Sequence, residues 1–140
     1  MFLTRMVYAS TANNNFTPKD IEDILIKARQ SNTKEDITGI LCFSRNYFIQ
    51  CIEGTRTKVN DLYHKILNDD RHSNIILLDY KEISEREFGY WSMSYVPESK
   101  LTTSINLKYS GSSIFNPYKM SGQSALNMLV EFKGVLKNVT

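Results

Sequence analysis

A glutamine inside an apolar segment is the first residue of this sequence whose chemistry needs an explanation. Residues 46–54, NYFIQCIEG, carry the β-branched and aromatic side chains typical of a largely buried strand, and Gln50 lies in their middle. A primary amide removed from water destabilises the fold unless its carbonyl and its two N–H donors find partners. We therefore expect either a solvated strand face or a polar partner for Gln50 in the interior.

Tyr8 is the candidate partner. It comes late in an alternating segment, Phe2 to Ala9, on the face opposite Val7. If the first and third strands are central neighbours in the sheet and both residues face the helices, the phenol can reach the Gln50 amide. Two simpler interpretations stay open from the residues alone: a private hydrogen bond in the core, or a Tyr8 hydroxyl in solvent.

Amphipathic helices and short strands must position these two residues. Apolar residues at helical spacing predict one helix from Thr17-Pro18 to about Ser31-Asn32, and a second from Thr55 or Thr57 to about 68–70. A short connection at 44–46 predicts a hairpin. The predicted strands cover residues 2–9, 37–43, 47–53, 75–83 and 91–96.

The element order βαββαββ predicts an α+β fold of the ferredoxin-like kind, a five-stranded mixed sheet with two helices on one face. The second face would be bare, and residues 124–136 show a further apolar helical stripe. We expect one or two C-terminal helices to pack on that face, and residues 108–122 to be loop-like. The predicted division is one domain over 1–97 and a helical extension over 98–140 that packs on its sheet.

Composition excludes several classes of function. The chain has 140 residues, 41% of them hydrophobic, and a net charge of +2 with no basic cluster, so we expect no nucleic-acid partner. No apolar run approaches the ~18 residues of a membrane span, and the N-terminus lacks a signal pattern, so a cytoplasmic protein is expected. Cys42 and Cys51 are predicted to be core residues, and no metal site or conventional catalytic motif is apparent.

Four segments together resemble the signature of the BLUF family, sensors of blue light that use FAD. They occur in the family's order and spacing from about Arg5 to Val96, and their joint occurrence is far more specific than any one of them. The segments are RMVYAS, ITGILCFSRNYFIQCIEG, NDDRHSNI and FGYWSMSYV.

The resemblance implies a flavin between the two helices, with Tyr8 and Gln50 as the photoactive pair. In the family's proposed sequence, the excited flavin takes an electron and a proton from Tyr8, and the Gln50 hydrogen bonds emerge rearranged. Trp91 and Met93 match a pair on the fifth strand whose positions shift on illumination. The remaining cofactor-binding residues that the resemblance implies are Ile24 and Ile66 on the two ring faces, Asn32 at the ring's polar edge, and Asp69, Arg71 and His72 near the other carbonyl and the ribityl chain.

The resemblance also bears on output. Family members often carry an enzyme after the sensor, but only 43 residues follow Pro97 here. The expectation is a short, non-enzymatic sensor that signals through the fifth strand and the C-terminal helices to an unidentified downstream protein, and that forms a homo-oligomer. Ser31 departs from the amide or imidazole that the family pattern favours before Asn32.

Two alternatives stay open. One is a flavin-free ferredoxin-like module that binds protein, or RNA through Tyr47, Phe48 and Tyr95 as stacking platforms. The other is a small flavin enzyme with a diffusible substrate. A colourless protein would favour the first, and turnover in the dark would favour the second.

Overall fold

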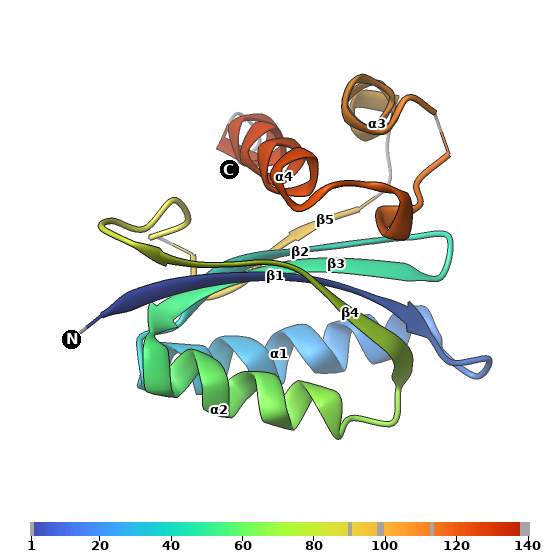
Figure 1. Cartoon of the computed structure of the whole chain (residues 1–140). Helices are drawn as coiled ribbons and strands as arrows, with labels where there is room; N and C mark the ends of the chain where they lie inside the picture. The colour runs from blue at the N-terminus through green and yellow to red at the C-terminus, as the bar shows by residue number, and fades with distance from the viewer. Residues whose placement is uncertain (1, 90, 98–99, 113, 138–140) are drawn as a thin grey trace.

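The computed structural model describes residues 2–89, 91–97, 100–112 and 114–137. Its elements form three layers, with α1 and α2 on one face of a central sheet and α3 and α4 on the other (Figure 1). The elements are β1 (Leu3–Ala12), α1 (Pro18–Glu35), β2 (Thr38–Ser44), β3 (Tyr47–Thr55), α2 (Arg56–Leu67), β4 (His72–Ile83), β5 (Ser94–Val96), α3 (Lys100–Ser110), the 3-10 helix η1 (Pro117–Lys119) and α4 (Gly122–Lys137).

The sheet has the predicted ferredoxin-like topology. Its strand order is β4-β1-β3-β2-β5, and every neighbouring pair is antiparallel except β2 and β5, which are parallel. β1 and β3 are therefore the central neighbours, as expected. Their register places Tyr8 directly opposite Gln50, so both side chains emerge on the same face of the sheet.

The first helix begins as predicted and ends later than predicted. The Asp20 carboxylate accepts a hydrogen bond of 2.8 Å from the backbone N–H of Thr17, which satisfies a donor that the helix leaves free. The predicted end near Ser31-Asn32 is wrong: α1 continues to Glu35, and Asp36 caps it in the left-handed conformation with φ 55°. Asn32 resembles a stop signal in sequence, but its side chain is buried on the helix face that packs on the sheet.

Strand ends also differ from the prediction. β4 begins at His72 rather than Ile75, and β5 covers only Ser94–Val96 rather than 91–96. The backbone N–H of Trp91 donates to the Phe88 carbonyl at 3.2 Å, a turn-like contact that keeps this part of the chain out of the regular strand. The side chains of residues 91–93 therefore need not alternate between the two faces of the sheet as those of a regular strand do.

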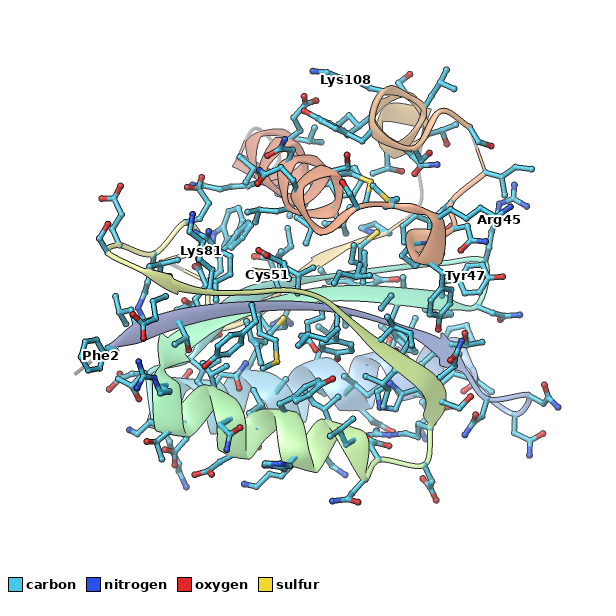
Figure 2. All side chains as sticks on the ribbon, viewed as in Figure 1. Phe2, Arg45, Tyr47, Cys51, Lys81 and Lys108 are labelled. Atoms are coloured by element: carbon cyan, nitrogen blue, oxygen red, sulfur yellow. The ribbon has the colours of Figure 1, made fainter. Side chains whose placement is uncertain are left out.

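Two apolar clusters lie on opposite sides of the sheet, and Figure 2 shows side chains filling both spaces. The helix-side cluster, packed between the sheet and the α1–α2 layer, includes Met6, Leu41, Ile52 and Val59. The extension-side cluster, between the sheet and the α3–α4 layer, includes Val7, Ile40, Cys51, Phe88, Leu129 and Phe132. Alternate residues of β1, β2 and β3 supply the two clusters, as the pleat of a strand requires.

The C-terminal extension covers the face that α1 and α2 leave bare. Residues 108–122, predicted as loop-like, in fact include the end of α3 and the short helix η1. α4 begins in close contact with the edge strand: a Cβ on Gly122 would lie 2.2 Å from the Leu78 carbonyl oxygen. Glycine is thus required where α4 meets β4.

Candidate functional site

A cavity of about 310 Å³ lies on the helix side of the sheet. This is within the range of roughly 300–1,000 Å³ typical of small-molecule sites. It is lined by residues of β1, α1, β2, β3, α2, the α2–β4 connection and the start of β4: Tyr8, Ile24, Lys27, Ala28, Ser31, Asn32, Leu41, Phe48, Gln50, Leu62, Lys65, Ile66, Asp69, Arg71 and His72.

Gln50 finds its partners inside this cavity wall. The Tyr8 hydroxyl donates a hydrogen bond to the Gln50 side-chain carbonyl, and the Gln50 amide nitrogen lies 3.4 Å from the Met93 sulfur. All three side chains are buried, with 4%, 7% and 1% of Tyr8, Gln50 and Met93 exposed. The Tyr8 phenol, the Gln50 amide and the Met93 thioether thus form a chain of two consecutive polar contacts.

Burial keeps the Tyr8 phenol neutral. Loss of hydration raises its pKa well above the ordinary value for tyrosine, and the negative charge of Asp69 raises it further. The ring has two polar aromatic neighbours, Tyr63 at 6.1 Å and His72 at 6.4 Å between ring centroids. Tyr8 is therefore a hydrogen-bond donor that holds its proton throughout the physiological pH range.

Asn32 presents an unsatisfied acceptor. Its amide nitrogen donates to the Ser92 carbonyl at 2.8 Å, whereas its side-chain oxygen is buried and has no partner among the described residues. A buried acceptor without a donor costs about 1–3 kcal/mol. Since Asn32 lines the cavity, a ligand N–H group placed there would remove this cost.

Apolar side chains face the cavity from both helices. Ile24 comes from α1, and Leu62 and Ile66 come from successive turns of α2. Branched aliphatic groups on two opposing walls suit a flat aromatic ligand, which needs apolar contact on both faces and polar contact at its edge.

A second polar group lies after the end of α2. Arg71 donates from Nε to both carboxylate oxygens of Asp69, at 2.9 and 3.2 Å. This contact holds the pKa of Asp69 below its ordinary value. The pair is partly exposed and lines the cavity, so an ionised carboxylate and a guanidinium both border the site.

His72 is engaged by protein on both ring nitrogens. Nδ1 lies 2.8 Å from the Ser10 hydroxyl and Nε2 lies 2.7 Å from the Ile66 carbonyl oxygen. The ring therefore connects the end of α2 to β1, and it contributes its surface to the cavity wall. Ser10, fully buried on the same face of β1 as Tyr8, was not singled out from the sequence, although its alternation with Tyr8 was readable.

Comparisons with known proteins identify the family of this chain. The family profile described as "Sensors of blue-light using FAD" (BLUF) matches residues 3–94. The chain belongs to the BLUF family. A curated relative, the "Blue light- and temperature-regulated antirepressor BluF" of Escherichia coli (strain K12), is 36% identical over 87 residues, which are 62% of this chain and 22% of that protein.

Solved BLUF structures share the whole architecture. "BlsA photo-activated state" is 37% identical with a TM-score of 0.85, covering 92% of this chain and 93% of that one. "BlrB - a BLUF protein, dark state structure" is 29% identical with a TM-score of 0.79, covering 93% of both. The chain spans only 22% and 12% of the length of curated relatives such as the antirepressor and the "Photoactivated adenylate cyclase subunit beta" of Euglena longa.

The BLUF assignment makes this domain a sensor of blue light rather than an enzyme, in line with the sequence-based expectation. The alternative of an RNA-binding platform is not favoured. Phe48 is buried on the helix side, whereas Tyr47 packs edge-on against Tyr118 of the extension at 5.6 Å. In the described parts of the chain, no helix has the length and apolarity to cross a membrane, and no group of metal-ligand side chains is present.

Of the two residues matched to the fifth strand, the BLUF domain brings only Met93 to Gln50. Trp91 packs instead with the extension-side cluster, 6.3 Å from the Phe88 ring between centroids. The cavity on the helix side is lined by all the other residues that the resemblance implies: Tyr8, Ile24, Asn32, Gln50, Ile66, Asp69, Arg71 and His72.

Further lining residues were missed at the sequence level. Leu62 could have been found, because it precedes Ile66 by one turn on the same apolar stripe. Lys27 and Lys65 carry no sequence signal that separates them from other surface lysines.

Proposed function

We propose that this blue-light sensor binds FAD in the cavity between α1 and α2, and that Tyr8 and Gln50 carry its response to light. The hydrogen-bonded series from Tyr8 through Gln50 to Met93 along the cavity wall supports this proposal most strongly. The unpaired carbonyl oxygen of Asn32 supports it independently, because a flavin ring carries an N–H group at its polar edge.

The residues present fit a flavin. Ile24 and Ile66 would contact its two faces, and Asn32 would accept from its N–H edge while the Ser92 carbonyl fixes the orientation of the amide. The Asp69–Arg71 pair and the Gln50 amide supply polar groups at the rest of the rim. When bound, the flavin supplies blue-light absorption and an oxidising excited state.

Tyr8 is suited to give up an electron and a proton together. Its pKa is raised by burial, so the phenol starts neutral, and loss of an electron makes its proton strongly acidic. Gln50 Oε1, which already accepts the Tyr8 hydrogen bond, can take that proton and return it. Carbonyl and amine ends of glutamine are similar in shape and opposite in hydrogen-bonding sense, so turning the side chain rewires the contacts without moving the backbone.

The stored free energy is small. A rearranged set of neutral hydrogen bonds is worth about 1–3 kcal/mol, which shifts a two-state equilibrium by roughly five- to 150-fold. The Gln50 contact to Met93 is the easiest to give up, because a thioether is a weak acceptor. We infer that signalling depends on a structural element whose two states already differ little in free energy, so that this small change can shift its equilibrium.

The segment between β4 and β5 is the proposed first output element. It carries Met93 and Ser92, which contact Gln50 and Asn32. The Glu87 backbone carbonyl and carboxylate also accept from the Lys133 ammonium of α4, at 2.6 and 3.0 Å. A shift of this segment thus has a direct route to the extension.

The recipient of the signal is proposed to be another protein. One relative is named as an antirepressor, which supports output by protein binding in this chain as well. We also propose that the protein forms a homo-oligomer and that it is located in the cytoplasm.

A phosphate-bearing flavin such as FAD, rather than riboflavin, is proposed from the positive charge at the cavity. Lys27 and Lys65 line it together with Arg71, and ammonium groups are suited to the phosphates that riboflavin lacks. Lys27→Met and Lys65→Met should weaken FAD binding about tenfold and leave riboflavin binding unchanged, as measured by fluorescence titration. Lys19→Met, at an exposed position of α1, is the control; equal losses for FAD and riboflavin would contradict the phosphate assignment.

The deciding experiment is optical. The purified chain, supplied with FAD and then freed of unbound flavin, should be yellow, and blue light should move its absorption band to longer wavelength with recovery in the dark. A chain that retains no flavin after the excess is removed, or a band that light does not move, would refute the proposal. Turnover of a diffusible substrate in the dark would instead favour a flavin enzyme.

A further inference from the structure

A second, much smaller cavity lies on the opposite face of the sheet, between β2 and the extension. We propose that it binds one ordered water molecule that bridges Ser44 of β2 and Asn106 of α3. Its volume is about 20 Å³, and its walls are formed by Cys42, Ser44, Thr102, Thr103, Asn106, Phe115 and Phe132.

Two polar atoms in these walls lack partners. Ser44 Oγ and Asn106 Oδ1 are both buried without a hydrogen bond among the described residues, and the two residues are only 7% and 3% exposed. They line the same cavity, yet they do not bond to each other. Buried polar groups in folded proteins are nearly always satisfied by protein or by ordered water.

The hydrogen-bonding inventory fits a water. The Asn106 amide nitrogen is used, since it donates to the Ser112 carbonyl at 3.1 Å, so the side-chain oxygen needs only a donor. The Ser44 hydroxyl can donate one hydrogen and accept others. A water that donates to Asn106 Oδ1 and accepts from Ser44 Oγ satisfies both atoms at once.

The size of the cavity limits its occupant. Roughly 10–15 Å³ is needed to admit one water, so about 20 Å³ admits a water and excludes an organic ligand. The buried rings of Phe115 and Phe132 form the apolar part of its wall. It is separate from the flavin cavity, because Ser44 and Cys42 lie on the face of β2 opposite Leu41.

This water has a consequence for α3. Two of the buried residues of this helix are polar, Thr102 and Asn106, whereas Leu107 is 52% exposed. At this cavity α3 thus presents polar side chains, whereas Ile105 and Tyr109 of the same helix pack against the extension-side cluster, so a bridging water adds a polar contact to the apolar packing of α3. Loss of the bridge should loosen α3 before it affects the flavin site.

A crystal structure of the full chain with flavin, at a resolution that shows waters, tests the site directly. We expect one ordered oxygen within hydrogen-bond distance of Ser44 Oγ and Asn106 Oδ1. An empty cavity, or a direct bond between the two side chains, would overturn the proposal.

A double-mutant cycle tests it in solution. Ser44→Ala and Asn106→Ala should each lower the folding equilibrium constant by about tenfold, and the double variant should fall short of the product of the two effects by at least threefold. Hydrogen exchange of α3 amides should quicken in Ser44→Ala, with α1 unchanged. Ser44→Ala combined with Asn127→Ala, an exposed position of α4, is the control pair and should multiply; purely multiplicative effects for Ser44 and Asn106 would contradict the bridge.

Discussion

At the residue scale, the molecule is organised around one buried amide. Gln50 contacts a phenol on one side and a thioether on the other, and it borders the cavity proposed for the flavin. The two contacts differ in strength, because the phenol is a good donor and the sulfur a weak acceptor. An amide between unequal partners is able to reorient at low cost.

We predict that Tyr8→Phe retains bound FAD and loses the light-induced absorption shift, because the electron and proton donor is gone while the ring remains. Gln50→Ala should have the same outcome. Absorption spectra before and after blue light measure both. Tyr63→Phe is the matched control, since Tyr63 lies 6.1 Å from the Tyr8 ring between centroids, whereas the hydroxyl that donates to Gln50 is that of Tyr8; a photocycle in Tyr8→Phe as large as in the parent would refute the pairing.

The raised pKa of Tyr8 leads us to predict that the free energy of unfolding depends on pH. Its folded-state pKa is raised, so the neutral phenol contributes its full stability below the unfolded value of about 10. Above that pH the unfolded chain releases a proton that the folded chain keeps, and stability falls by up to ~1.4 kcal/mol per pH unit. Urea unfolding between pH 9 and 11 should show a shallower fall in Tyr8→Phe than in the parent; equal slopes would contradict the raised pKa.

At the element scale, α2 separates cavity-lining from solvent-facing residues. Ile66 lines the cavity, whereas the next residue, Leu67, is 43% exposed. The Ile66 carbonyl also accepts from the His72 ring, and this ring contacts Ser10 of β1. The end of α2 is thereby fixed to the sheet at the point where Ile66 lines the cavity.

We predict that Ile66→Asp weakens FAD binding by at least a hundredfold, because a buried, unpaired carboxylate costs several kcal/mol. Leu67→Asp, the adjacent control, should bind FAD like the parent. Titration of the flavin-free protein with FAD measures both. A yellow Ile66→Asp variant with parental affinity would place the flavin elsewhere.

At the scale of the whole molecule, the sheet separates a ligand side from an extension side. Phe132 of α4 is 2% exposed within the extension-side cluster, whereas Leu107 of α3 faces solvent. The segment with Glu87 and Met93 contacts both sides through Lys133 and Gln50. Stability of the extension and binding of the flavin should therefore be separable, while signalling depends on both.

Phe132→Ala should lower the free energy of unfolding by about 3–5 kcal/mol, because it empties a packed site. Leu107→Ala should cost less than about 0.5 kcal/mol, because its side chain is already hydrated. Urea denaturation measures both effects, and FAD affinity should be unchanged in either folded variant. A loss of stability in Leu107→Ala equal to that in Phe132→Ala would show that α3 is packed differently.

The sequence by itself determined the element order and the neighbouring positions of β1 and β3, because strand alternation and short connections leave few arrangements of a βαββαββ chain. It allowed the contact of Tyr8 with Gln50 only on the condition that both side chains face the helices. It also predicted the aliphatic stripes of α1 and α2, since helical spacing places Ile24 and Ile66 on the inward faces.

Only the tertiary structure decided which of Trp91 and Met93 meets Gln50. Two residues apart on a regular strand would share a face, but β5 begins at Ser94, so these two side chains enter opposite clusters. Other features also depend on which surfaces pack together, and the local sequence does not predict them. They are the late end of α1, the lysines at the cavity, and the buried, unpaired side-chain oxygens of Asn32, Ser44 and Asn106.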